Sequence, residues 1–329
     1  MRRILPLVLI LLVCACQNQP NQPEPKPKQT VTVPVFNADS AFAFVKAQTD
    51  FGPRVPFTEA HEQCCHWLVE KLAQYADTVI VQEFRTRLYT NQGADGKNII
   101  ASFNPNATKR VVLCSHWDSR PYADHDPDEA NWNLPIDGAN DGASGVGVLI
   151  ESARCFRNQP LPEKLGVDII LFDLEDYGPR HDLAEKYYDD RRNYWALGSQ
   201  HWSAQPHVPG YRANYGILLD MVGGSNPNFM KEYYSQGYAA WLSNKVWHLA
   251  QDLGYHRYFV NELGDPISDD HLPMNEIAGI PTIDIIDLQP QSTNQSFPEN
   301  WHTLDDNIEH IDSNTLGMVG NVLLHIVYE

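Results

Sequence analysis

Histidines and carboxylates recur where apolar, β-branched segments of the chain end, or in the loops that follow them. These residues are His116, Asp118, Asp141, Glu175, Asp176, Asp220 and His302. Imidazole and carboxylate groups are ligands that Zn²⁺ takes, usually four in number with one position open in catalytic sites. Adjacent carboxylates such as Glu175 and Asp176 also repel each other unless a cation or a proton intervenes. The pattern therefore predicts a catalytic metal site.

Each of these features alone also has a structural explanation. His116 would be held at a strand end by Asp118, and Asp141 would cap the helix that follows it. Trp301-His302 would be core packing with a satisfied histidine. The metal hypothesis depends on all of these features occurring in one chain at expected strand ends and loops.

The elements that must position these residues alternate along the chain. Strands are expected at 78–84, 98–103, 110–114, 167–174, 215–221 and 280–286. Amphipathic helices are expected at 40–48, 61–75, 143–156, 195–203, 238–253 and 313–327. Nearly continuous apolar strands are typical of a sheet that is covered on both faces. The fold class predicted is α/β, a mixed central sheet between helices, with ligands beyond the carboxyl ends of its strands.

The motifs, taken in order from about residue 40 to the C-terminus, resemble a known family. It is that of the animal-type, zinc-dependent glutaminyl-peptide cyclotransferases (glutaminyl cyclases) and their bacterial relatives, which share the zinc aminopeptidase-like sandwich. The segments that carry the resemblance include Ser115-His116-Trp117-Asp118, Gly138-Ala139-Asn140-Asp141, Leu174-Glu175-Asp176, Asp269-Asp270-His271-Leu272-Pro273 and Phe297-Pro298-Glu299-Asn300-Trp301-His302. The last two segments look specific to the cyclase branch, whereas the His-x-Asp pattern, the Glu-Asp pair and the final His302 are shared with the aminopeptidases.

The resemblance implies one Zn²⁺ per chain, held by Asp141, Asp176 and His302. Animal members commonly have Glu where this chain has Asp176, which shortens that ligand by one methylene. The expected reaction is an acyl transfer that converts the N-terminal glutamine of peptides or proteins to pyroglutamate and releases ammonia.

The resemblance also implies the roles of the residues around the metal. Glu175 would be the general acid/base, and Asp220 and Asp269 would form a hydrogen-bonded carboxylate group beside it. The pocket for the glutamine side chain would be lined by Ile267, Phe297 and Trp301, with Trp195 as a further wall. The stretch 177–194, just before Trp195, is longer than in animal members.

Two alternatives to the cyclase interpretation stay open. In a two-zinc aminopeptidase, His116, Asp141 and Asp220 would hold a second Zn²⁺ and activate a bridging water. In a non-catalytic lipoprotein, the same scaffold would only bind peptides, which the presence of Glu175 disfavours.

The N-terminus has the pattern of an export signal. Two arginines precede an apolar run at 4–13, and Cys16 follows in a lipobox-like context. We expect a signal peptide at 1–15, a lipidated Cys16 with a Pro-rich tether at 16–35, and one catalytic domain at 36–329. The expected location is the bacterial outer membrane, facing the periplasm, with the membrane bound by the lipid anchor only.

Composition excludes several other functions. With 24 Lys and Arg against 42 Asp and Glu, the formal net charge is −18, which disfavours nucleic acid as a partner.

The acidic loop 122–135 lacks the glycine and terminal Glu of an EF-hand, and the charged run 182–192 is most simply a solvated loop. Disulfide pairing among Cys64, Cys65, Cys114 and Cys155 is not assigned by their spacing.

Overall fold

The computed structural model describes residues 32–188 and 192–329. The predicted signal peptide, the lipidation at Cys16 and most of the predicted tether lie outside the described residues. The folded part is built on a six-stranded sheet of order β1-β2-β4-β3-β5-β8. Its strands are β1 (Thr78–Arg87), β2 (Gly93–Phe103), β3 (Lys109–His116), β4 (Leu165–Phe172), β5 (Tyr215–Asp220) and β8 (Thr282–Ile286).

All six of these strands were expected from their apolar runs. A separate pair, β6 (Phe229–Lys231) with β7 (Phe259–Leu263), was not, because segments this short carry little periodicity. The sheet is mixed, as predicted. β1 and β2 run antiparallel to their neighbours, whereas β4, β3, β5 and β8 are mutually parallel.

The parallel part of the sheet determines where the functional side chains meet. β3 lies between β4 and β5, so the connection from β3 leads to one side and the connection from β4 returns to the other. Such a reversal of strand order leaves a crevice at the carboxyl ends of the strands. His116 ends β3, Glu175 follows β4 and Asp220 ends β5, so their residues open onto that crevice.

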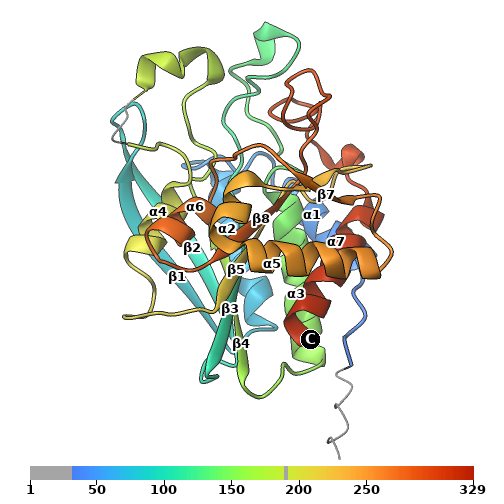
Figure 1. The fold of residues 1–329 in the computed structure, drawn as a ribbon. Coiled ribbons are helices and arrows are strands. Elements are labelled where there is room, and N and C mark those ends of the chain that lie inside the picture. Colours follow the sequence, from blue (N-terminus) through green and yellow to red (C-terminus); the bar gives the residue numbers. More distant parts are fainter. Residues whose placement is uncertain (1–31, 189–191) are drawn as a thin grey trace, which may run out of the picture. The chain divides into compact units, whose positions relative to one another are not determined.

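Helices cover both faces of the sheet, as predicted (Figure 1). They are α1 (Ala38–Thr49), α2 (Glu59–Ala73), α3 (Ala143–Asn158), α4 (Leu197–Ala204), α5 (Tyr233–Asp252), α6 (His271–Glu276) and α7 (Ser313–Tyr328). The larger core packs α1, α2, α3, α5 and α7 against one face, and α4 and α6 contribute to the core on the other. Of these helices only the short α6 was not expected.

Alternate residues of one strand enter different cores. Val111 and Leu113 of β3 belong to the larger core, whereas Val112 and Cys114 belong to the smaller. α3 packs very closely on the sheet at Gly145, where a Cβ atom would lie 2.4 Å from the Leu219 carbonyl oxygen. This close approach holds the start of α3, and the preceding loop with Asp141, against the strand ends.

The four cysteines of the folded part are buried, and their thiols are free. Burial raises the pKa of the Cys64 thiol to about 12, which makes it a poor nucleophile. Among the described residues, no helix combines the length and apolarity required to cross a membrane.

Candidate active site

A cavity of about 340 Å³ lies at the carboxyl ends of the parallel strands. The residues predicted for catalysis, substrate binding and the first metal all line it: Asp141, Glu175, Asp176, Trp195, Asp220, Ile267, Asp269, Phe297, Trp301 and His302. His116 lies just behind this wall, within contact distance of Asp141 and Asp220. The structure thus brings together residues that are spread over more than half of the chain.

Asp141, Asp176 and His302 form a group whose donor atoms all lie within 4.8 Å of one another. The His302 Nε2 atom is 3.5 Å from Asp141 Oδ2 and 3.4 Å from Asp176 Oδ1. The second oxygen of Asp176 is buried without a hydrogen-bond partner, and burial and Asp141 raise the pKa of Asp176. Two buried carboxylates that share one imidazole are a donor set that fits Zn²⁺.

An ion pair supports this group from behind. Arg120 binds Asp124 through Nε and Nη2, both at 2.7 Å, and its Nη1 lies 3.2 Å from Asp176 Oδ1. Asp124 Oδ1 is also 3.4 Å from His302 Nδ1, so it can orient the imidazole with Nε2 toward the other ligands. Although Asp124 is buried, Arg120 holds the pKa of its carboxyl well below the usual range.

Arg120 and Asp124 were not among the residues predicted for the site. Asp124 was noted only as one of the acidic residues of the loop 122–135, and the structure shows that it is fully buried. Its partners are close in sequence at position 120 and distant at positions 181 and 302. The Arg-x-x-x-Asp spacing was the only local signal.

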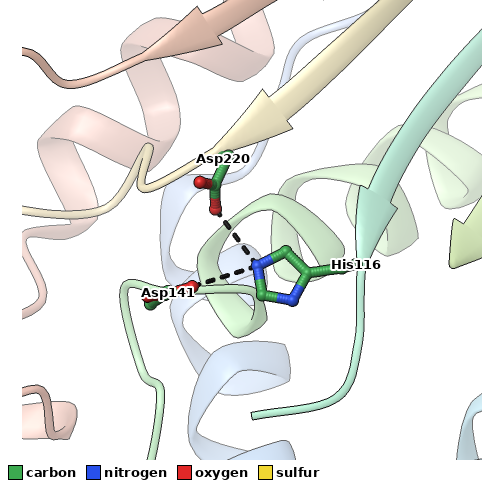
Figure 2. A group of neighbouring side chains, drawn as sticks. All are labelled: His116, Asp141 and Asp220. Carbon is green, nitrogen blue, oxygen red and sulfur yellow. Dashed lines mark hydrogen bonds and ion pairs between the residues drawn. The ribbon is translucent and has the colours of Figure 1, made fainter. Parts of the chain in front are cut away.

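A second group shares Asp141. His116 Nε2 lies 3.0 Å from Asp141 Oδ1 and 3.3 Å from Asp220 Oδ1, as Figure 2 shows. Its Nδ1 is 3.6 Å from Asp118. Against the opposing effect of burial, these three carboxylates raise the pKa of His116 well above its ordinary value. The donor atoms of His116, Asp141 and Asp220 lie within 4.8 Å of one another, so they are also candidate ligands of a second ion.

Glu175 lies in the cavity wall beside other acidic groups. Burial is the main cause that raises its pKa well above the ordinary value, and Asp269 is the next. Burial, with contributions from Asp141 and Asp269, also raises the pKa of Asp220 to about 7. Glu175, Asp220 and Asp269 thus lie together in the cavity wall, and burial raises the pKa of all three. The hydrogen bonds expected between them stay a prediction.

Aromatic side chains form much of the remaining wall. Trp301 stacks on His302 with ring centroids 3.7 Å apart and lies 4.6 Å from Phe297. Trp195 lies over the Arg120 guanidinium, 4.7 Å away, and is nearly parallel to the His302 ring. The long stretch before Trp195 does not remove this side chain from the cavity.

The described part of that stretch is mostly exposed from residue 181 onward. It contains two short 3₁₀ turns, His181–Leu183 and Glu185–Tyr187. The backbone N–H of His181 donates to Asp124 Oδ2, and the His181 ring contacts Trp132 and His125. Within the charged run 182–192, most of the described residues are exposed, as expected of a solvated loop, and these contacts with the acidic loop 122–135 are made by His181, just before the run.

A third buried group lies behind Asp269. Asp269, His271 and Asp284 offer donor atoms within 4.8 Å of one another, and His271 Nε2 is 3.2 Å from Glu232 Oε2. Sequence reasoning noted His271 only within a motif and gave no role to Glu232 or Asp284. Glu232 also accepts the backbone N–H of Ile267 at 3.1 Å, which ties one wall of the cavity to the start of α5.

Three of the non-glycine residues with left-handed φ angles lie at the cavity. Leu174, Met221 and His302 have φ angles of 56°, 48° and 55°, in the left-handed region that favours glycine. Such conformations cluster at functional sites, where the surrounding structure imposes them. Here each one sits at or beside a residue of the predicted site.

Two solved structures are similar to this chain in sequence and in fold. A crystal structure of Bacteroides thetaiotaomicron glutaminyl cyclase bound to N-acetylhistamine is 48% identical, with a TM-score of 0.85 and coverage of 91% of this chain and 99% of that one. A Zn-dependent exopeptidase from Parabacteroides distasonis is 47% identical, with a TM-score of 0.86 and coverage of 91% and 100%. These likenesses, with the donor set described above, confirm the predicted fold class and zinc dependence.

Curated relatives are more distant. The Bos taurus glutaminyl-peptide cyclotransferase is 30% identical over 70% of this chain and 65% of its own length. The match to these curated cyclotransferases thus covers slightly less than two thirds of their own length. The family model described as Peptidase family M28 matches residues 98–327, which includes nearly the whole of the site. Because that match covers well over half of the chain, this protein belongs to Peptidase family M28.

Proposed function

We propose that this protein is a zinc-dependent glutaminyl-peptide cyclotransferase that converts N-terminal glutamine to pyroglutamate and releases ammonia. The observation that carries the proposal is the composition of the cavity, in which a metal-ligand group, a weakly acidic glutamate and aromatic walls face one space. The likeness to a solved glutaminyl cyclase at 48% identity over nearly its whole chain supports the same conclusion.

Asp141, Asp176 and His302 would hold the zinc ion. When bound there, Zn²⁺ supplies Lewis-acid polarisation of a carbonyl oxygen. Asp124 keeps the His302 imidazole oriented, and Arg120 offsets part of the negative charge of the carboxylate ligands.

Glu175 would transfer the proton. The substrate α-amine has an ordinary pKa of about 7.7 to 8.0 and must be neutral to attack. Glu175 takes a proton from this nitrogen as it bonds to the γ-amide carbon of the same residue. Glu175 then gives the proton to the amide nitrogen as its bond to that carbon breaks, and ammonia leaves. The raised pKa of Glu175 suits a group that must both accept and donate.

The aromatic walls would determine the shape of the bound substrate. Phe297, Trp301 and Trp195 leave a space in which a glutamine side chain must curl back toward its own amine. Holding the two reacting groups together converts their encounter into a favourable intramolecular one. The same walls exclude water that would otherwise hydrolyse the amide.

Aminopeptidase action is a second candidate, because His116, Asp141 and Asp220 offer donor atoms for another ion beside the first. Incubation of the purified zinc-loaded protein with a Gln-initiated peptide, followed by mass spectrometry, separates the two activities. Loss of ammonia supports cyclisation, whereas loss of the whole first residue supports peptidase action. A matched Ala-initiated peptide serves as the control, since it cannot cyclise but can be shortened.

We also propose that the protein is a lipoprotein of the bacterial outer membrane, anchored through Cys16 and facing the periplasm. The arginines, the apolar run and the lipobox-like cysteine support this proposal. Incorporation of labelled fatty acid into the wild-type protein, and its loss in Cys16→Ser, is the expected result. Equal labelling of both would contradict the anchor, and fractionation of the membranes tests the location.

A further inference from the structure

Two carboxylates outside the cavity hold the backbone of the residues that form it. Asp118 accepts the backbone N–H of Glu175 at Oδ1 (3.1 Å) and that of Asp176 at Oδ2 (3.2 Å). Asp306 accepts the N–H of Asn140 at Oδ1 (2.7 Å) and that of Asp141 at Oδ2 (3.0 Å). Both carboxylates are buried. We call Asp118 and Asp306 the carboxylate clamps.

The held segments lack the support of regular secondary structure. Glu175 and Asp176 follow Leu174, which has the left-handed φ of 56°, and lie beyond the end of β4. Asp141 lies between Gly138 and Gly142, which also have positive φ angles. Buried backbone N–H groups need acceptors, and here no ladder or helix supplies them. Each clamp supplies two acceptors to two consecutive residues, which fixes the peptide plane between them.

The two clamps differ in what they hold. Asp118 binds the backbone of the acid/base Glu175 and of the metal ligand Asp176. Asp306 binds the backbone of only one functional residue, the ligand Asp141. His116 also lies near Asp118, with Nδ1 3.6 Å from Oδ1. Loss of Asp118 should therefore displace two functions at once, and loss of Asp306 only one.

We propose that Asp118 and Asp306 are positioning residues for the active site: Asp118 sets the acid/base and one zinc ligand, and Asp306 sets the opposite zinc ligand. The activity part of this inference rests on the proposed function, and the metal-binding part does not. Groups that orient metal ligands typically change metal affinity by about 10- to 100-fold when they are replaced.

The test compares Asp118→Asn and Asp306→Asn with a matched control, Asp168→Asn. Asparagine keeps one acceptor but turns an NH₂ group toward a backbone N–H, so one clamp bond is lost. Asp168 is equally buried, but it binds Ser102 and Arg110 on the sheet, away from the cavity. Zinc Kd is measured by competition with a chromophoric chelator, and ammonia release gives kcat at saturating zinc. Measurements at pH 8 lie above the pKa of about 7 to which burial and Asp141 raise Asp306.

We expect Asp306→Asn to weaken zinc binding by at least about tenfold while kcat at saturating zinc stays within about threefold of wild type. Asp118→Asn should weaken zinc binding similarly and also lower kcat at saturating zinc by at least about tenfold. Asp168→Asn should lower Tm with no change in zinc Kd. A clamp variant that does not fold is replaced by Asp→Glu at the same position, which keeps both oxygens but displaces them by one methylene.

The inference is overturned if the clamp variants, like Asp168→Asn, change only Tm. It is also overturned if Asp306→Asn lowers kcat at saturating zinc as much as Asp118→Asn does. If zinc Kd shifts as expected but wild type releases no ammonia from Gln-initiated peptides, the proposed function fails while the metal-positioning role of the clamps stands.

Discussion

Replacement of Glu175 by glutamine removes the proposed proton carrier and leaves its shape in place. The side chain is nearly isosteric, and Asp118 still accepts the backbone N–H at position 175, so the zinc ligand next to it should not move. General acid–base catalysis is worth about 10²- to 10⁴-fold. Because Glu175 acts in both bond formation and ammonia departure, we expect kcat to fall by about 10³- to 10⁴-fold. This corresponds to about 4 to 5.5 kcal/mol of transition-state stabilisation.

The same substitution should stabilise the zinc-free protein at high pH. Burial and Asp269 raise the folded-state pKa of Glu175 well above its ordinary value of 4.5. Between the ordinary and the raised pKa, the unfolded chain loses this proton more readily than the folded one, so the wild type loses stability as pH rises. Glutamine does not titrate, and the Tm of E175Q should therefore exceed that of wild type by more at pH 8 than at pH 5.

The assay measures ammonia release from a Gln-initiated peptide at full zinc occupancy, with zinc content determined on the same sample. Glu151→Gln is the control, since Glu151 is also buried but pairs with Arg154 on α3, away from the cavity. It should alter stability and leave kcat unchanged. If E175Q keeps more than about a tenth of wild-type kcat with zinc bound, Glu175 is not the group that moves the proton.

Three further outcomes are expected. Burial and Arg120 lower the pKa of metal-free His302, but carboxylates including Asp176 outweigh them and raise it to about 10, so zinc must displace a proton from this imidazole. Zinc binding should therefore weaken about tenfold for each pH unit from 9 down to 6. Proton release during zinc titration measures this effect, and a zinc Kd that does not change with pH would contradict it. Phe297→Ala removes one aromatic wall of the cavity, so it should lower kcat/KM for Gln-initiated peptides by about 10- to 200-fold and leave the zinc Kd unchanged. An unaltered kcat/KM would show that Phe297 does not contact the substrate. A chelator should abolish ammonia release and lower Tm. Zinc added back at about 1,000 times its Kd should restore roughly 4 kcal/mol to the free energy of unfolding. Activity that survives complete zinc removal would refute the metal's role.

Much of the site could be predicted because strand ends leave local marks. The run before Glu175 is mostly apolar over the length of a buried strand, and Glu175 and Asp176 follow shortly after its end, at the sheet edge. His116 and Asp220 were located in the same way. The ranges of the long helices and strands followed from periodicity, and the structure differs from them mainly by a few residues at each end.

The sequence by itself thus determined the α/β class, the edge at which the chemistry lies and the residue types that meet there. Only the tertiary structure decided which buried carboxylates support these residues. Asp124 contacts the His302 imidazole, Asp306 accepts the backbone N–H of Asp141, and Glu232 accepts the backbone N–H of Ile267. Those contacts join loops that are 35 to 178 residues apart, in segments without repeating patterns. Their side chains are buried because separate elements pack over them, and no local propensity specifies which distant backbone N–H or imidazole a carboxylate will face.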